Sequence, residues 1–270
     1  MTRHRRRALL FTLLLITSIA VVIGLGLWSQ RRQYTLDRQL IAALLKGDIQ
    51  QAAALVEAGA DPNTPLVPPS PPSLRQLWNF LLHRSHLPGN DNQNAFLIAC
   101  GAYWNGSDYG PDAPQLTQAM LRHNANPNAK DEVGWTPLLC AIRGNQPKTV
   151  GVLLDYGTDA NAKDNDGWTP LIEASHTASA ESVRQLLAHG AAVNAQDDGG
   201  STALQRAVNF VLENDPSSSR VVVTDIIPQL LQHGANPNLP DKNGTTALKQ
   251  AQSFERPDLV ALLRRAGAKK

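Results

Sequence analysis

The longest uninterrupted apolar stretch lies near the N-terminus. Residues 8–28 form a run of 21 positions without a charged side chain. A helix of this length rises about 30 Å, which matches the hydrocarbon thickness of a bilayer. Four arginines precede the run, and Arg31, Arg32 and Arg38 follow it. This pattern predicts a single-pass membrane protein with a basic cytoplasmic N-terminus at 1–7, a transmembrane signal anchor at 8–28 and an extracytoplasmic body, periplasmic in a bacterium.

A cleaved signal peptide is the alternative interpretation of this stretch. The segment Ser18-Ile19-Ala20 places small residues at the spacing of a cleavage site. However, the apolar run continues through Leu27, whereas the apolar region of a signal peptide usually has only about 7–15 residues. The length therefore favours an uncleaved anchor.

Beyond residue 36, apolar and turn-forming residues recur with a fixed period. The segment Gly134-Trp135-Thr136-Pro137-Leu138 returns 33 residues later as Gly167-Trp168-Thr169-Pro170-Leu171. Related segments begin at Gly200 and Gly244. A second landmark, a Leu-Leu pair closed by glycine, ends units at Gly157, Gly190, Gly234 and Gly267, with spacings of 33, 44 and 33. Two landmarks thus give one period and place an 11-residue insertion in one unit.

Each period predicts two short helices. Thr136 is suited to cap a helix, and Pro137 fits the first helical position, where a missing N–H costs nothing. Val150, Leu153 and Leu154 give the apolar stripe of a second helix. Gly157 then supplies a left-handed C-cap. Such a helix pair has too little apolar area to fold alone, so neighbouring pairs are expected to stack.

These motifs resemble the ankyrin-repeat family. The residues that carry the resemblance are Asp131-Glu132-Val133-Gly134-Trp135-Thr136-Pro137-Leu138, Val152-Leu153-Leu154, Gly157 and Asn161-Ala162, and residues 164–196 follow the same pattern. The resemblance covers about residues 36–270. It implies an all-α solenoid of about six helix-turn-helix units, preceded here by one transmembrane helix.

The landmarks also divide the chain. A linker is expected at 29–35 and an ankyrin-repeat domain at 36–270. Its units span about 36–63, 64–128 with insertions 65–93 and 104–113, 129–161, 162–194, 195–238 with insertion 211–222, and 239–270. In the longest insertion, an amphipathic helix around Trp78 either covers unit two or contacts a partner or membrane.

Charge and cysteine content exclude several classes of function and site. The chain has 25 Lys+Arg and 23 Asp+Glu, but four of the arginines lie in residues 1–7, so the remainder carries a net charge of −2. Such a body does not suit nucleic-acid binding, which needs a surplus of cations. Its two cysteines, Cys100 and Cys140, are too few for a disulfide framework or a four-thiolate zinc site. Both fit buried positions on inner helices. They lie 6 and 4 residues after the expected caps of those helices, and these unequal offsets argue against a disulfide between them.

Catalytic motifs are not evident. The sequence lacks phosphate-binding, dinucleotide-binding, zinc-protease and serine-hydrolase signatures, so no cofactor or small-molecule substrate is expected. His83 and His86 share one helical face, and a metal there would need a third ligand such as Asp91 or His123. His123, His189 and His233 each end a second helix, where imidazole bonds free carbonyls. Glu173 interrupts an apolar face and is interpreted as a partly buried network acid.

The resemblance also implies where a partner binds, because ankyrin proteins usually use loop tips and inner helices. The positions carried over are Glu132, Trp135, Arg143, Asp166, Trp168, His176, Asp198 and Lys242. Trp135 and Trp168 occupy equivalent positions, so we expect them roughly 10 Å apart on one face. They serve either as interface anchors or as packing for their own loops.

The sequence therefore favours a membrane-anchored, non-catalytic scaffold for an unknown protein partner. One alternative is an inhibitor or immunity-type protein that neutralises one specific partner. The other is a metal-dependent enzyme built around the insertion in unit two, with His83, His86, Asp91 and Cys100.

Overall fold

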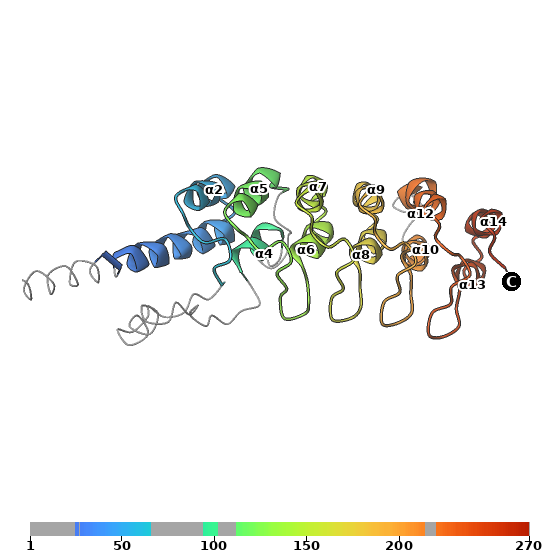
Figure 1. The fold of residues 1–270 in the computed structure, drawn as a ribbon. Helices are drawn as coiled ribbons and strands as arrows, with labels where there is room; N and C mark the ends of the chain where they lie inside the picture. The colour runs from blue at the N-terminus through green and yellow to red at the C-terminus, as the bar shows by residue number, and fades with distance from the viewer. Residues whose placement is uncertain (1–24, 27, 66–93, 102–111, 214–219, 270) are drawn as a thin grey trace, which may run out of the picture.

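The computed structural model describes residues 25–26, 28–65, 94–101, 112–213 and 220–269. These residues form paired helices stacked in single file, with long loops extending from one side of the stack (Figure 1). Their only bridges are two isolated ones, Pro65 with Asn94 and Gln196 with Thr202, so the described part of the chain is all-helical. Most of the expected anchor, residues 8–24 and 27, lies outside it. Within the described ranges, no helix is long and apolar enough to cross a membrane.

The inner helices line one side of the stack and the outer helices the other. After an N-terminal helix at residues 28–46, the inner helices are α4 (Ala95–Ala99), α6 (Pro137–Arg143), α8 (Pro170–His176), α10 (Ala203–Glu213) and α13 (Ala247–Ser253). The outer helices are α2 (Ile49–Glu57), α5 (Pro114–Arg122), α7 (Pro147–Asp155), α9 (Ala180–Ala188), α12 (Ile227–Gln232) and α14 (Pro257–Arg265). The described residues thus pair into six repeats.

The N-terminal helix differs from what the sequence predicted for residues 29–35. Residues 29–35, expected to be a linker, are helical and continue without a break into the inner helix of the first repeat. The segment 28–46 contains neither glycine nor proline, so nothing interrupts its backbone hydrogen bonding before Gly47, which has a positive φ of 80°.

Local capping fixes where the inner helices begin. The hydroxyls of Thr136, Thr169 and Thr246 accept hydrogen bonds from the backbone N–H three residues later, at 3.3 Å in each case. Asn94 does the same for α4, accepting from the N–H of Leu97 at 3.0 Å. Asn94 therefore caps α4 as the threonines cap their helices, although unit two departs most from the period.

Leucines at one position of successive inner helices form the centre of the core. Leu138, Leu171, Leu204 and Leu248 are each only 1% exposed and belong to one continuous apolar cluster. Each inner helix contacts the next, as α6 contacts α8 and α8 contacts α10. Because every repeat buries its apolar face against its neighbours, no repeat has a core of its own.

The fifth repeat is built differently from its neighbours. Its inner helix α10 has 11 residues, against seven in α6 and α8. A π-helical turn, η1 (Val222–Ile226), precedes α12. Pro228 near the start of α12 has no backbone N–H, and a wider turn accommodates that missing donor. Of the expected insertion 211–222, residues 214–219 lie outside the described part of the chain. Residues 66–93 of the expected insertion 65–93 and residues 104–111 of the expected insertion 104–113 also lie outside it.

Asparagine side chains join successive repeats. After α9, the side-chain amide of Asn194 donates to the carbonyl of Gly234 at 3.0 Å, and the N–H of Asn236 donates to Asn194 Oδ1 at 2.7 Å. Equivalent contacts to the following repeat are made by Asn63, Asn128, Asn161 and Asn238. We call this set the asparagine ladder.

The N-terminal helix begins the same ladder with two different side chains. Gln33 Nε2 donates to the carbonyl of Gly59 at 2.9 Å, and the N–H of Asp61 donates to Asp37 Oδ1 at 2.8 Å. Gln33 thus supplies the donor and Asp37 the acceptor that one asparagine supplies elsewhere. Gln33 also donates to Asp37 at 2.8 Å, which holds the pair together. The N-terminal helix is therefore an integral part of the first repeat.

Candidate partner-binding surface

Four hairpin tips project from the stack just before the inner helices of repeats three to six. We call these segments, residues 131–135, 164–168, 197–201 and 241–245, the hairpin tips. Each begins with an aspartate whose Oδ1 accepts backbone N–H groups from its own turn. Asp164, for example, accepts from Asp166 at 3.0 Å and Trp168 at 2.8 Å. The aspartate therefore sets the conformation of the turn locally.

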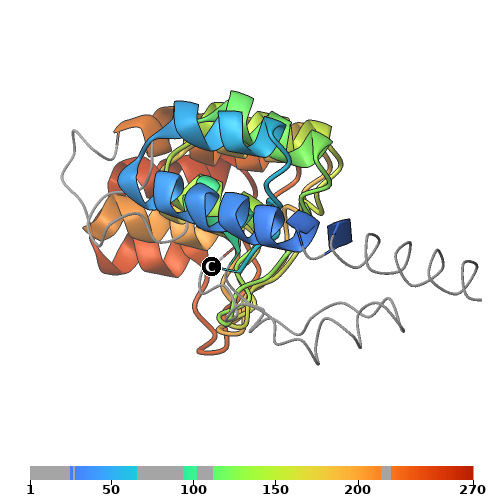
Figure 2. The ribbon, with the colours of Figure 1, turned by 90° about the vertical axis from the view of Figure 1, so that its left-hand side faces the viewer.

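Backbone hydrogen bonds tie each tip to the next. The N–H of Asn165 donates to the carbonyl of Val133 at 3.1 Å, that of Asp198 to Asp166 at 3.0 Å, and that of Lys242 to Gly199 at 3.0 Å. Viewed along the stack, the tips gather on one side of the molecule (Figure 2). A row of loops linked in this way presents its side chains on a largely preformed surface.

Glycines allow this close approach. Gly167 has a φ of +77°, and a Cβ built there would lie 2.8 Å from the backbone N of Asp198. Gly134 and Gly200 meet the next tip at the same 2.8 Å. Gly244, in the last tip, has a φ of +73° but nothing within 4 Å. Three of the four tip glycines are therefore needed both for backbone conformation and for space.

The exposed charged side chains of the tips are mainly acidic. Glu132, Asp166 and Asp198 are exposed at successive tips, and Lys242 is exposed at the last one. Val133 adds an apolar group that is 49% exposed. Four of the eight predicted binding residues therefore lie on the exposed tip row, with three acids followed by one base.

The other four predicted residues form an aromatic and cationic wall, made by Trp135 and Trp168 at the ends of two tips and by Arg143 and His176 on the inner helices. The Cζ of Arg143 lies 5.3 Å from the centroid of the Trp135 ring. Its Nη1 also donates to Glu173 Oε1 at 2.8 Å, and the Glu173 side chain is only 5% exposed. Glu173 is thus the buried network acid predicted from the sequence, and it links the third and fourth repeats.

A second group links the fourth and fifth repeats. The Cζ of Arg206 lies 4.5 Å from the centroid of the Trp168 ring, and its Nε donates to Asp197 Oδ2 at 3.2 Å. The Asp197 side chain is 1% exposed. His176 meets the same indole edge-on, with ring centroids 5.1 Å apart. Both tryptophans are therefore contacted by an arginine that a buried carboxylate holds in place.

The two indoles accordingly pack within the solenoid. Trp135 and Trp168 are half-buried and lie against the core cluster. Of the two roles expected for them, the structure supports packing. The surface that remains open to a partner is formed by the exposed tip side chains and the outer edges of the arginine and histidine side chains beside the indoles.

Arg206 and Asp197 were not among the residues predicted from the sequence. Arg206 lies 33 residues after Glu173, which itself lies 33 after Cys140, so one inner-helix position carries a thiol, an acid and a base in turn. That change of chemistry at a repeating position was a signal in the sequence. Its meaning depends on stacking, which places Arg206 over an indole of the preceding repeat.

Neither cysteine is suited to nucleophilic catalysis. Cys100 and Cys140 are free thiols buried on adjacent inner helices. Burial raises the pKa of Cys100 to about 12 and raises that of Cys140 well above its ordinary value. At neutral pH both therefore remain protonated, and a protonated thiol is a poor nucleophile and metal ligand.

The predicted metal ligands are mostly not described. His83, His86 and Asp91 lie outside the described residues, and within those residues no group of three potential ligands gathers. Two of the three helix-end histidines bond as expected: Nδ1 of His189 and of His233 donates to a carbonyl of the last turn, at 2.9 and 2.8 Å. Nε2 of His123 lies 3.4 Å from Glu57. These side chains act at helix ends.

Comparison with known proteins agrees with this architecture. A family model described as ankyrin repeats (3 copies) matches residues 75–164, 107–197 and 145–215, which together span more than half of the chain. The chain belongs to the ankyrin-repeat family. It is also similar to a crystal structure of an ankyrin repeat domain from Acinetobacter baumannii AYE, with 26% identity, a TM-score of 0.64, and coverage of 85% of this chain and 98% of that chain. Comparison with curated proteins found no match.

Proposed function

We propose that this protein is a membrane-anchored, non-catalytic scaffold that binds another protein through its hairpin tips. Membership of the ankyrin-repeat family indicates a protein–protein interaction module. The observation that carries the choice of surface is the chain of tip-to-tip hydrogen bonds from Val133 to Lys242. A surface that is ordered before binding loses little conformational entropy in the complex.

The proposed contact residues have two roles. Glu132, Asp166, Asp198 and Lys242 are exposed and meet the partner directly. Trp135, Arg143, Trp168 and His176 form the wall beside them, where arginine and aromatic edges complete the contact. Because three tips in a row carry an acid, the matching patch on the partner is basic.

Membrane anchoring is the second part of the proposal. The uncharged run 8–28 supports an anchor, and the arginines before it support an N-terminus in the cytoplasm with the repeats extracytoplasmic. Alkaline carbonate should leave the full chain in the membrane pellet. Protease added outside sealed spheroplasts should digest the repeats. Release by carbonate would exclude the anchor, and full protection of the repeats would reverse the orientation.

Charge-neutral variants at the tips test the binding surface. We expect Glu132→Gln/Asp166→Asn/Asp198→Asn to weaken capture of the native partner from crosslinked membranes about tenfold or more, because rim charges contribute to both association rate and affinity. The matched control removes three exposed acids from outer helices: Glu57→Gln/Glu181→Gln/Asp225→Asn. Equal loss in both triple variants would show a net-charge effect and refute the tip surface.

A further inference from the structure

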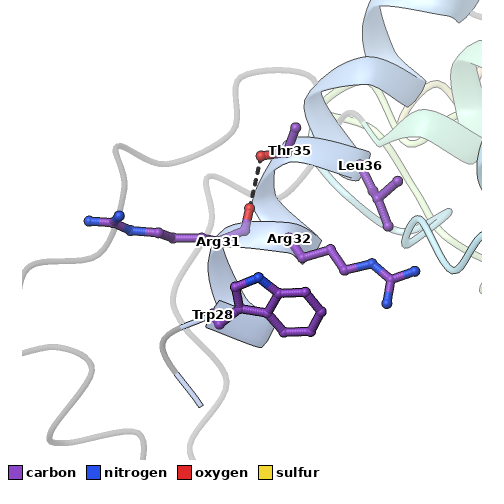
Figure 3. A pocket seen from close by; sticks show the side chains of 5 residues that line it. All are labelled: Trp28, Arg31, Arg32, Thr35 and Leu36. Carbon is purple, nitrogen blue, oxygen red and sulfur yellow. Dashed lines mark hydrogen bonds between the residues drawn. The ribbon is translucent and has the colours of Figure 1, made fainter. Parts of the chain in front are cut away.

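The first turns of the N-terminal helix carry an exposed aromatic and basic surface. Leu25 and Trp28 are 61% and 63% exposed, and Arg31 and Arg32 are exposed beside them. A surface hollow of about 280 Å³ lies here, lined by Trp28, Arg31, Arg32, Thr35 and Leu36 (Figure 3). Trp28, Arg32 and Leu36 follow one another at intervals of four residues, so they share one helical face.

The guanidinium groups of Arg31 and Arg32 are available to a ligand. The Cζ of Arg32 lies 5.9 Å from the centroid of the Trp28 ring. Within the described residues, no carboxylate forms an ion pair with Arg31 or Arg32. The nearest acid along the chain, Asp37, accepts from Gln33 and from the N–H of Asp61. The Thr35 hydroxyl donates to the Arg31 carbonyl at 2.9 Å. The Arg31 and Arg32 side chains extend in opposite directions, with Arg32 on the side of Trp28 (Figure 3).

We propose that Trp28, Arg31 and Arg32 form a binding site for the phosphate groups of anionic lipid headgroups; this inference rests on the proposed membrane anchoring. The uncharged run ends at Trp28, which places these side chains at headgroup depth. Indole rings favour that interfacial layer, and guanidinium groups donate two parallel hydrogen bonds to phosphate.

The contact is transmitted to the repeats through the helix itself. Gln33 follows Arg32 directly, and it joins Asp37 in binding the loop at Gly59 and Asp61. The N-terminal helix continues unbroken through residue 46 and buries Leu40 and Leu44 in the core. Headgroup binding at Arg31 and Arg32 therefore fixes the depth and the tilt of the whole solenoid relative to the bilayer.

Charge favours lipid over a second copy of the chain at this site. Two helices meeting through this face would bring Arg31 and Arg32 of one copy against the same arginines of the other. Like charges at such short range repel, and only counter-ions would offset the repulsion. The phosphate groups of anionic headgroups supply the opposite charge at this depth without a partner protein.

Fluorescence quenching by brominated lipid tests this proposal. The full chain is reconstituted in equimolar phosphatidylcholine and phosphatidylglycerol, with bromine placed near the headgroup of one lipid or the other. The emission of Trp28 is isolated as the difference between the wild type and Trp28→Phe. We expect stronger quenching when the phosphatidylglycerol carries the bromine, and we expect high salt to weaken the difference.

Removing the arginines should abolish the lipid preference. The association constant for phosphatidylglycerol relative to phosphatidylcholine, obtained from the quenching curves, should fall about fivefold for each of Arg31→Gln and Arg32→Gln, the factor equivalent to about 1 kcal/mol. The matched control is Arg264→Gln/Arg265→Gln, which removes two exposed arginines from the end of α14 and should leave the ratio unchanged.

The outcomes separate the site from the anchor. Equal quenching by both lipids, or a preference that survives loss of both arginines, overturns the headgroup site while a carbonate-resistant chain keeps the anchor. Absence of quenching in a chain that carbonate releases overturns both. Crosslinking of two copies through position 28, without lipid preference, assigns the surface to self-association and also overturns the proposal.

Discussion

At the level of single residues, aspartates at equivalent turn positions have different partners in different repeats. Asp164 and Asp197 both close their own hairpin tips through Oδ1. In Asp197, the second oxygen also binds Arg206, which covers Trp168. Stability and surface chemistry are therefore coupled at this point, because the arginine beside the candidate binding surface also neutralises a buried acid.

Replacing Arg206 should destabilise the protein strongly. Arg206→Met leaves the buried Asp197 carboxylate without a cation, and we expect a loss of about 3 kcal/mol in unfolding free energy. Thermal melts followed by circular dichroism of the full chain in detergent would measure it. Arg184→Met, which breaks an exposed pair with Glu181, is the matched control and should change the melting temperature little. Similar losses in both variants would contradict the importance of burial.

The raised pKa of Asp37 predicts that the stability of the protein depends on pH. Its pKa is raised above the ordinary value of 3.8, chiefly by burial, although its hydrogen bonds with Asp61 and Gln33 oppose the shift. The native state thus binds a proton more readily than the unfolded state, and the wild type gains stability as pH falls through the native pKa towards 3.8. Asp37→Asn removes the buried charge and restores the residue found elsewhere in the asparagine ladder.

We therefore expect Asp37→Asn to melt at a higher temperature than the wild type at neutral pH. The difference should shrink as pH falls through the native pKa and level off below 3.8, where Asp37 is protonated in both states. Melting curves from neutral to acidic pH would show this convergence. A variant that is less stable at neutral pH, or a difference that grows on acidification, would contradict the assigned cost of burial.

Local rules predicted the residues that act within their own repeat. Thr136, His189 and His233 were each assigned from their immediate neighbours, and their hydrogen bonds follow those assignments. Contacts across repeats were harder to predict. The pairing of Arg206 with Trp168 joins residues that only stacking brings together. The packing role of the indoles likewise depends on the neighbouring repeats.

At the level of elements, the hairpin tips are stabilised by one another more than by their own length. Each is a five-residue turn that a single aspartate closes, and each of the last three donates a backbone hydrogen bond to the tip before it. The N-terminal helix shows the same dependence, since Gln33 and Asp37 hold it to the first loop. This continuity was not predicted, because a basic stretch after an apolar run is typical of a linker as well as of a helix.

Alanine variants at two tip glycines distinguish the cost of backbone strain from the cost of close packing. Both Gly167→Ala and Gly244→Ala force alanine into a left-handed conformation, which costs about 1–2 kcal/mol. Gly167→Ala also places a methyl group 2.8 Å from the backbone N of Asp198, whereas Gly244→Ala meets nothing within 4 Å. We expect Gly167→Ala to cost at least about 1 kcal/mol more, because the adjoining tip must shift.

Urea titrations of the two alanine variants would measure this difference. Hydrogen exchange adds a local readout, because Gly167→Ala should also speed exchange at the N–H of Asp198, whose bond to Asp166 the shift disturbs. Equal unfolding free energies in the two variants would show that the tips are independent turns and would remove the main support for a preformed surface.

At the level of the whole molecule, the described helix pairs stack in single file (Figure 1). The periodic sequence predicted an all-helical solenoid, and the described residues form one. The partner could not be predicted, because ankyrin repeats fix a backbone while the exposed side chains decide what binds. If residues 8–28 anchor the chain, the continuous N-terminal helix presents the tips in a defined direction relative to the bilayer.

Site-specific photocrosslinking in native membranes tests the central claim most directly. A photoreactive amino acid replaces Asp166 at the middle of the tip row, and in a matched chain it replaces Glu181 on the outer helix α9; both positions are exposed. We predict a discrete crosslinked protein from position 166 and none from position 181. A crosslink from position 181 alone would place the partner on the outer helices and contradict the proposed surface.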